Sequence, residues 1–210
     1  MHVISDLESQ FGGIDIYLFD QLLRGRMPRG MRVLDAGCGT GRNLVYFLRE
    51  GYDVHATDLD AGAIAAVRRL AARLESQLPP ANFRIEPVER MTFPDAFADV
   101  VLSSAVLHFA ADEAQFDAMV REMWRVLKPG GLFFCRLAST IGMEQRMRRI
   151  EGRRFRLPDG SDRFLVDESM LVALTRSLGG TLLDPLKTSV VQDQRCMTTW
   201  VVRKDLHRYD

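Results

Sequence analysis

The fold is decided by the stretch VLDAGCGTG at residues 33–41. A short apolar run, Arg32–Gly37, leads into glycines at alternate positions, and a helical pattern follows over Arg42–Glu50. This order predicts a strand, a tight loop and a helix. Glycines let the backbone turn sharply and approach a ligand without Cβ clashes, and the first amides of the next helix point to the same place. The stretch therefore predicts a ligand-binding loop.

The spacing of the glycines narrows the class of ligand. Gly37, Gly39 and Gly41 form a Gly-x-Gly-x-Gly pattern, which differs from the Gly-x-Gly-x-x-Gly pattern of nicotinamide-binding loops. No Gly-Lys-Ser/Thr follows, so the signature of an ATP-binding phosphate loop is missing. Asp35 lies inside the strand, ahead of the glycines, where its carboxylate can order the loop or reach an amino group.

A second acidic residue stands at the end of the next predicted strand. That strand covers Asp53–Thr57, and Asp58 follows it, about 20 residues beyond the glycines. A carboxylate at the carboxyl edge of the neighbouring strand can accept hydrogen bonds from both hydroxyls of a ribose. The loop and this acid together predict a ligand that contains a nucleoside.

The rest of the chain alternates between strand and helix patterns. We expect strands over Asn82–Glu86, Asp99–Ser103 and Leu132–Leu137, and helices over residues 14–24, Ala61–Gln77, Glu113–Val126 and 167–177. Such alternation implies right-handed crossovers and a doubly wound, mostly parallel α/β sheet. Near the end of the chain, Thr181–Lys187 and Arg195–Arg203 are expected to pair as an antiparallel hairpin.

We expect one domain over residues 1–210, with two embellishments. Residues 1–30 are predicted to form an N-terminal helical cap, and residues 138–165 an insertion that could serve as a substrate lid. The insertion is rich in arginine, with Arg146, Arg148, Arg149, Arg153, Arg154 and Arg156. A solvated helix is the simplest expectation for these arginines, and a lid or an anion-attracting patch is the alternative.

The composition argues against several classes of function. Basic and acidic residues number 28 each, so no net charge draws the chain to nucleic acid or to an anionic membrane. The cysteines Cys38, Cys135 and Cys196 form no zinc motif and suggest no disulfide framework, which favours a reducing compartment. No run is apolar for long enough to span a membrane, and the acidic residues near the start argue against a secretory leader. We therefore expect a soluble cytoplasmic protein without a metal, either a monomer or a homodimer.

Taken together, the motifs resemble those of the class I S-adenosylmethionine-dependent methyltransferases. The resemblance covers roughly residues 30–137 and rests on residues 33–41, 93–101, 106–108 and 125–131, and on Asp58. It implies S-adenosyl-L-methionine as the cofactor. It also implies a sheet of seven strands with the last one antiparallel, which agrees with the predicted hairpin. The sequence Gly41-Arg42-Asn43 at the end of the glycine loop and residues 195–200 are similar to those of uncharacterised bacterial members of this group.

The resemblance also assigns residues to parts of the cofactor. Gly37 and Gly39 would hold the methionine part, Asp58 the ribose, and Leu59 would pack on adenine. Pro87 stands where many relatives have an acid, so Glu89 or a backbone carbonyl must accept from the adenine amine. The full set of expected cofactor-binding residues is Tyr17, Asp35, Ala36, Gly37, Cys38, Gly39, Asn43, Asp58, Leu59, Val88, Glu89 and Ser104.

Three further side chains each have two interpretations. His108 is either a general base near the transferred methyl group or a structural residue at the start of a helix. Tyr17 either folds over the cofactor or belongs to the core. Arg136, at the end of the fifth strand, either meets an anionic substrate or is solvated or ion-paired.

The reaction that these motifs imply is methyl transfer to an O, N or S nucleophile of a small molecule. The cofactor would supply the reactive group, and the protein would supply orientation, desolvation and at most one base. Methylation of RNA or protein is the second hypothesis. Ser103-Ser104-Ala105-Val106 stands where amine methylation of bases often uses Asp/Asn-Pro-Pro-Tyr/Phe, so nucleic acid is disfavoured as a partner. A non-catalytic cofactor-binding module is the third hypothesis.

Overall fold

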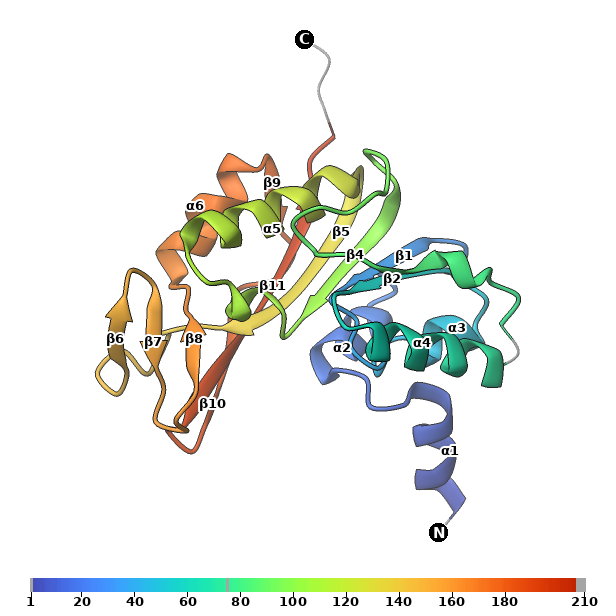
Figure 1. Ribbon diagram of the computed structural model, residues 1–210, viewed down its shortest axis with the longest axis horizontal. Helices are drawn as coiled ribbons and strands as arrows, with labels where there is room; N and C mark the ends of the chain where they lie inside the picture. The colour runs from blue at the N-terminus through green and yellow to red at the C-terminus, as the bar shows by residue number, and fades with distance from the viewer. Residues whose placement is uncertain (1, 75, 207–210) are drawn as a thin grey trace.

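The computed structural model describes residues 2–74 and 76–206. Its centre is an eight-stranded sheet (Figure 1), in which seven strands follow the order β3-β2-β1-β4-β5-β11-β10 and β9 pairs with β11. The strands are β1 (Arg32–Ala36), β2 (Asp53–Asp58), β3 (Phe83–Ile85), β4 (Ala98–Ser104), β5 (Leu127–Ala138), β9 (Gly180–Leu182), β10 (Lys187–Val191) and β11 (Arg195–Lys204).

The first five strands of this sheet are parallel, and the last strands are antiparallel. Strand β1 pairs in parallel with β2 on one side and β4 on the other, so the strand order reverses beside β1. Strand β11 runs antiparallel to β5, β9 and β10. The predicted doubly wound, mostly parallel sheet with an antiparallel C-terminal part is thereby confirmed, with the short strand β9 in addition. Ligands in such sheets bind where the strand order reverses, at the carboxyl ends of the strands.

Helices cover both faces of the sheet (Figure 1). The helices α2 (Ile16–Leu23), α3 (Val45–Arg49) and α4 (Ala61–Arg73) pack on one face, and α5 (Glu113–Val126) and α6 (Glu168–Ser177) on the other. Helix α5 begins where the Asp112 side chain accepts a hydrogen bond from the Gln115 N–H, and it buries one stripe that includes Phe116, Val120 and Met123. Each face thus has its own apolar core.

Several predicted boundaries were wrong. The helix after the glycine loop begins at Val45, three residues later than expected, because residues 42–44 form a turn. The predicted hairpin strand 181–187 is two strands, β9 and β10, and β10 carries most of the pairing with β11. Within the segment predicted as an N-terminal helical cap, the helix α1 (His2–Phe11) precedes α2, and the Phe11 ring stacks on Tyr46 of α3 at 5.3 Å.

The arginine-rich insertion is a small sheet, so the expectation of a solvated helix was wrong. Its strands are β6 (Arg148–Glu151), β7 (Arg154–Arg156) and β8 (Asp162–Phe164), paired antiparallel in that order. Turns at Gly152 and at residues 157–160 connect them. Phe164 is buried and stacks on Phe116 of α5 at 4.7 Å, which anchors the small sheet on the main domain.

Within the described ranges, no helix has both the length and the apolar character needed to cross a bilayer.

Candidate functional site

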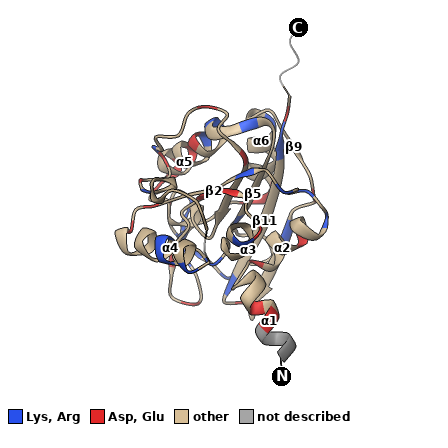
Figure 2. Cartoon of the chain, turned by 90° about the vertical axis from the view of Figure 1, so that its right-hand side faces the viewer, with Lys and Arg blue, Asp and Glu red and all other residues tan. Residues whose placement is uncertain are grey.

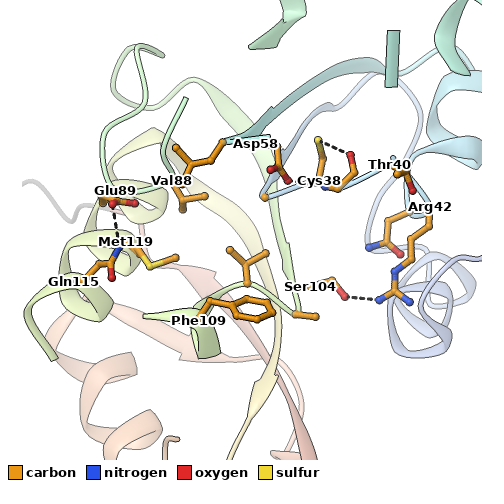
Figure 3. Close-up of a pocket in the computed structure, with 16 residues that line it drawn as sticks. Cys38, Thr40, Arg42, Asp58, Val88, Glu89, Ser104, Phe109, Gln115 and Met119 are labelled. Atoms are coloured by element: carbon orange, nitrogen blue, oxygen red, sulfur yellow. Dashed lines mark hydrogen bonds between the residues drawn. The ribbon is translucent and has the colours of Figure 1, made fainter. Parts of the chain in front are cut away.

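A cavity of about 680 Å³ opens at the carboxyl ends of β1, β2 and β4 (Figure 3). Its size is in the usual range for a small-molecule or cofactor site. The lining residues are Gly37, Cys38, Gly39, Thr40, Arg42, Asn43, Asp58, Leu59, Val88, Glu89, Ser104, Ala105, Val106, Phe109, Gln115 and Met119. The cavity therefore lies at the point where the strand order reverses, between residues from both halves of the sheet.

The glycine loop is fixed by close contacts that only glycine permits. Gly37 has a φ of 82°, and a Cβ atom there would lie 2.5 Å from Cγ2 of Val106. The N–H groups of Gly37 and Cys38 both donate to the Thr57 carbonyl at 2.9 Å, which ties the loop to β2. Burial raises the pKa of the Cys38 thiol, so Cys38 behaves as a small apolar side chain.

Asp58 closes one side of the cavity (Figure 3). Its Oδ2 accepts from the Gly39 N–H at 2.8 Å, and its Oδ1 accepts from the Asp60 N–H at 2.9 Å. A carboxylate oxygen can accept two hydrogen bonds, so each oxygen keeps the capacity for one more donor. Asp58 is thus held in place by the backbone and still able to bind two hydroxyls.

Asp35 lies below the loop in β1 and is only 1% exposed. Its pKa is raised to about 7, because burial and, to a smaller extent, the negative charge of Asp58 outweigh the positive charge of Arg42. Its Oδ2 is buried and has no hydrogen-bond partner among the described residues. A buried acceptor without a donor is costly, so this oxygen is suited to a donor that a ligand brings.

The far side of the cavity is apolar and open. Leu59 and Phe109 line it although they are 68% and 63% exposed, and Met119 of α5 adds a soft side chain. Gln115 Nε2 donates to Glu89 Oε1 at 3.1 Å across this side (Figure 3). Exposed apolar side chains beside a cavity are typical of a surface that a ligand covers.

A polar cluster joins the N-terminal helices to the opposite edge of the cavity. Asn43 Oδ1 accepts from the Asp15 N–H at 2.9 Å, and Arg136 Nη1 donates to Asp15 Oδ2 at 2.6 Å. Arg42 Nη2 donates to Ser104 Oγ at 3.2 Å across the cavity wall (Figure 3). The cluster connects the loop after β1 with the ends of β4 and β5.

A second cavity, of about 290 Å³, adjoins the first. Ala105, which has a φ of 65°, lines both cavities and marks the place where they meet. The other lining residues are His108, Arg136, Ala138, Leu157, Asp159, Ser161, Arg163, Val191, Arg195, Cys196 and Met197. One wall therefore comes from the insertion, and the opposite wall from the ends of β5, β10 and β11.

His108 lies in the short helix η2 (Leu107–Phe109) and lines the second cavity. Its Nδ1 accepts from the Ala138 N–H at 3.3 Å. Burial and, to a smaller extent, the positive charge of Arg163 together lower the pKa of His108 to about 4. The imidazole is therefore neutral at neutral pH.

Comparisons with known proteins agree with this geometry. Residues 34–135 match the family described as "Methyltransferase domain". A Mycolicibacterium smegmatis protein described as a probable S-adenosylmethionine-dependent methyltransferase is 35% identical over 53% of this chain and 40% of its own. The malonyl-[acyl-carrier protein] O-methyltransferase of Enterobacter lignolyticus is 34% identical over 78% of this chain and 61% of its own. The chain thus spans less than two thirds of the length of these curated relatives.

A solved structure has the same fold. It is the 1,6-didemethyltoxoflavin-N1-methyltransferase of Burkholderia thailandensis, with bound 1,6-didemethyltoxoflavin and S-adenosylhomocysteine. It is 22% identical, aligns over 97% of this chain and 83% of its own, and has a TM-score of 0.69. Residues 34–135 therefore form a methyltransferase domain of the class I S-adenosylmethionine-dependent type. The cofactor of this methyltransferase is S-adenosyl-L-methionine.

Observations within the methyltransferase fit this cofactor. Asp58 keeps two free acceptor positions, Asp35 has an unpartnered buried oxygen, and Leu59 offers an exposed apolar side chain. The predicted residues that line the first cavity are Gly37, Cys38, Gly39, Asn43, Asp58, Leu59, Val88, Glu89 and Ser104. Most of the predicted set is therefore brought together in one cavity.

Three predicted residues lie outside the lining of the first cavity. Asp35 and Ala36 are buried in β1 beneath it. Tyr17 bonds through its hydroxyl to Ser189 Oγ of β10, and the Arg136 guanidinium lies 5.1 Å from its ring centre. Tyr17 therefore reaches toward the C-terminal hairpin, away from the expected position over the cofactor, because a contact far along the chain holds its hydroxyl.

Sequence reasoning missed several lining residues of the first cavity, namely Thr40, Arg42, Ala105, Val106, Phe109, Gln115 and Met119. Arg42 had a usable signal, since it directly follows the last glycine of the loop. Gln115 and Met119 are four residues apart on α5, so they share one helix face, but nothing in the local pattern points that face at the loop.

Proposed function

We propose that this methyltransferase transfers a methyl group from S-adenosyl-L-methionine to an O, N or S nucleophile of a small molecule. The observation that carries the proposal is the junction at Ala105, where a cofactor-sized cavity meets a smaller one. The smaller cavity, of about 290 Å³, suits a compact acceptor. The comparisons support methyl transfer to oxygen or nitrogen, since one relative is named for O-methylation of malonyl-[acyl-carrier protein] and one structural neighbour for N1-methylation of 1,6-didemethyltoxoflavin.

When bound, the cofactor supplies an electrophilic methyl group on a positively charged sulfur. In this proposal Gly37 and Gly39 hold its methionine part, Asp58 accepts from both ribose hydroxyls, and Leu59 packs on the adenine. Val88 and Glu89 stand at the adenine edge, with Gln115 fixing the Glu89 carboxylate. Asn43 and Ser104, which belong to the polar cluster with Asp15, Arg42 and Arg136, contact the methionine part of the cofactor in this proposal.

The protein itself contributes position and exclusion of water. Phe109 lines the first cavity, and the Arg163 guanidinium lies 4.8 Å from its ring centre, so the aromatic ring separates cofactor from acceptor residues. Holding two reactants in line removes much of the entropic cost of their encounter. Such positioning requires no catalytic constellation, which agrees with the lack of one in the sequence.

RNA or protein methylation has less support. In Figure 2, basic and acidic residues are interspersed along the chain. The arginines of the insertion are partly neutralised, because Arg153 pairs with Asp167, Arg156 with Asp162 and Arg146 with Asp193.

The free cysteines Cys38, Cys135 and Cys196 support our proposal that the protein works in the reducing cytoplasm.

Calorimetry and a product assay test the proposed function. We expect S-adenosyl-L-methionine and its demethylated product to bind at roughly micromolar concentration, about 8 kcal/mol, and NAD not to bind. Release of the demethylated product should then depend on a small-molecule acceptor. Binding of NAD in place of both cofactor forms would contradict the family assignment. Cofactor binding with turnover only on RNA or protein, or with no turnover on any acceptor, would contradict the small-molecule proposal.

A further inference from the structure

The second cavity carries more positive than negative charge. Arg136, Arg163 and Arg195 line it, and Asp159 is its only carboxylate among the residues that the structure describes. The Asp159 carboxylate accepts from both the N–H and the hydroxyl of Ser161, which lowers its pKa and fixes it within its own turn. The charges of Arg195 and Arg163 also act on Asp159, but the three arginines outnumber this one carboxylate in the lining.

Arg136 has a donor that no protein group uses. Its Nη1 donates to the fully buried Asp15 side chain at 2.6 Å, but its Nε is buried and has no partner among the described residues. Leaving a guanidinium N–H buried and unbonded is costly. Because Arg136 lies beside Ala105, whose N–H donates to the Arg136 carbonyl, this guanidinium stands where the two cavities meet.

His108 adds a further donor at the same place. Its Nδ1 accepts the Ala138 N–H, so in the neutral ring the proton must be on Nε2. No described residue bonds to Nε2. The general-base role that the sequence allowed needs a free lone pair, and this geometry has already used the lone pair of Nδ1. A neutral His108 in this tautomer donates a hydrogen bond and cannot take a proton.

We propose that the second cavity binds the methyl acceptor as a small carboxylate, and that a carboxylate oxygen itself receives the methyl group. This inference rests on the proposed function. The three guanidinium groups and the Nε2–H of His108 bind the negatively charged carboxylate of the acceptor. Arg136 and His108 line the cavity together with Ala105, where the two cavities meet. Carboxylates are ionised at neutral pH without help, whereas phenols and alcohols must lose a proton to a base. Asp159, the carboxylate among the described lining residues, is held by Ser161 and has a lowered pKa, so this junction favours a carboxylate acceptor over a phenol or an alcohol.

The proposed step balances without a proton acceptor. A lone pair on the carboxylate oxygen forms the new C–O bond while the methyl–sulfur bond breaks, and that bonding pair stays on sulfur. The negative charge of the acceptor and the positive charge of the sulfonium cancel. The products are a neutral methyl ester and the neutral thioether, and no proton is released.

Binding of paired probes tests the charge preference. The probes are malonate, benzoate and cinnamate, each compared with its amide, titrated into the complex with S-adenosylhomocysteine. We expect at least one carboxylate to bind about tenfold or more tightly than its amide. Arg195→Gln and Arg163→Gln should each weaken that carboxylate about tenfold. Arg148→Gln, on the same small sheet but outside the cavity, is the matched control.

The test has clear contrary outcomes. Equal affinity of carboxylate and amide, no binding of any carboxylate, or equal losses in Arg148→Gln and Arg195→Gln would each overturn the inference. Binding of S-adenosylhomocysteine is measured first in every variant. Its absence in the unmodified protein would instead reject the proposed function, so the two failures are distinguishable.

Two His108 variants separate donation from proton transfer. Gln keeps an N–H donor near the Nε2 position and cannot act as a base, whereas Leu removes both functions. We expect His108→Gln to retain most turnover of the best carboxylate and His108→Leu to lose about tenfold or more. Turnover of the unmodified protein should be flat from pH 6 to 9, and the product should be a methyl ester by mass spectrometry. Equal losses in both variants, a pH-dependent rise, or methylation at another atom would overturn the inference.

Discussion

The N–H of Gly39 donates to Oδ2 of Asp58 at 2.8 Å, so the acid at the end of β2 also holds the loop that follows β1. Two motifs that lie apart in the sequence are therefore one structural unit. The same carboxylate that shapes the loop has two acceptor positions left for a ligand. Loop geometry and ligand binding are coupled through a single side chain.

We expect Asp58→Ala to weaken binding of S-adenosyl-L-methionine by about 1.5–3 kcal/mol for each charge-assisted hydrogen bond that is lost. The matched control is Asp60→Ala, two residues away, whose carboxylate accepts from Gly62 N–H at the start of α4. Asp60→Ala should cost about 1 kcal/mol of stability through the lost cap and leave cofactor affinity unchanged. Calorimetry and thermal unfolding of both variants check this. Normal cofactor binding by a folded Asp58→Ala would remove Asp58 from the site.

Gly37→Ala should both destabilise the protein and weaken cofactor binding. Its φ of 82° disfavours any side chain, and the new Cβ would lie 2.5 Å from Cγ2 of Val106. We expect the free energy of unfolding to fall by about 2–4 kcal/mol, because of backbone strain and overpacking together. Gly30→Ala is the control, because Gly30 has a φ of 89° and a Cβ added there would meet no atom within 4 Å.

Chemical denaturation of five proteins (the unmodified protein, Gly30→Ala, Gly37→Ala, Val106→Ala and the Gly37→Ala/Val106→Ala double variant) separates the two contributions to the Gly37 effect. Gly30→Ala should lose about 1 kcal/mol from strain alone. Adding Val106→Ala to Gly37→Ala should recover the part that is due to the clash, in a double-mutant cycle. If Gly37→Ala is no less stable than Gly30→Ala, the contact with Val106 makes no contribution to the free energy of unfolding.

The sequence could predict what is local. The glycine loop, Asp58 and the alternation that builds the parallel sheet all depend on residues near one another, and the structure has them as expected. Strands of three residues, such as β7 and β8, are too short to show an alternation of apolar and polar residues. They are held in place by the stacking of the Phe164 ring on the Phe116 ring of α5. Tyr17 was misplaced for the same reason, since its partner Ser189 is far along the chain.

The small sheet β6-β7-β8 should respond to ligands unevenly. Leu157, Asp159 and Arg163 line the second cavity, whereas Leu165 and Val166 are fully buried at the base of the insertion. We expect amide hydrogen exchange over residues 154–163 to slow about tenfold or more when S-adenosylhomocysteine and a bound acceptor are both present. Amides at 164–166 should already be protected. Equal exchange over 154–163 with and without ligands would identify a permanently packed element and not a lid.

The last prediction concerns the dependence of stability on pH, because burial raises the pKa of Asp35 to about 7 from an ordinary 3.8. Below pH 4 the carboxyl is protonated in both the folded and the unfolded chain. Between pH 4 and 7 the unfolded chain releases this proton while the folded chain keeps it. The free energy of unfolding therefore falls as pH rises through this window, by up to about 1.4 kcal/mol per pH unit from this group.

Asp35→Asn removes that slope, so the variant should gain stability relative to the unmodified protein as pH rises from 4 to 8. Asp167→Asn is the control with the opposite sign. Hydrogen bonds from Ser169, Met170 and Arg153 outweigh burial and lower the Asp167 pKa to about 2, so its contribution is lost as pH falls below 4. Urea denaturation without ligand at about pH 3, 4, 6 and 8 measures both, with the Asp167 effect between the two lowest values and the Asp35 effect above pH 4. A constant difference between Asp35→Asn and the unmodified protein across these pH values would mean that Asp35 is ionised in the folded chain throughout, stabilised by Arg42 despite its burial.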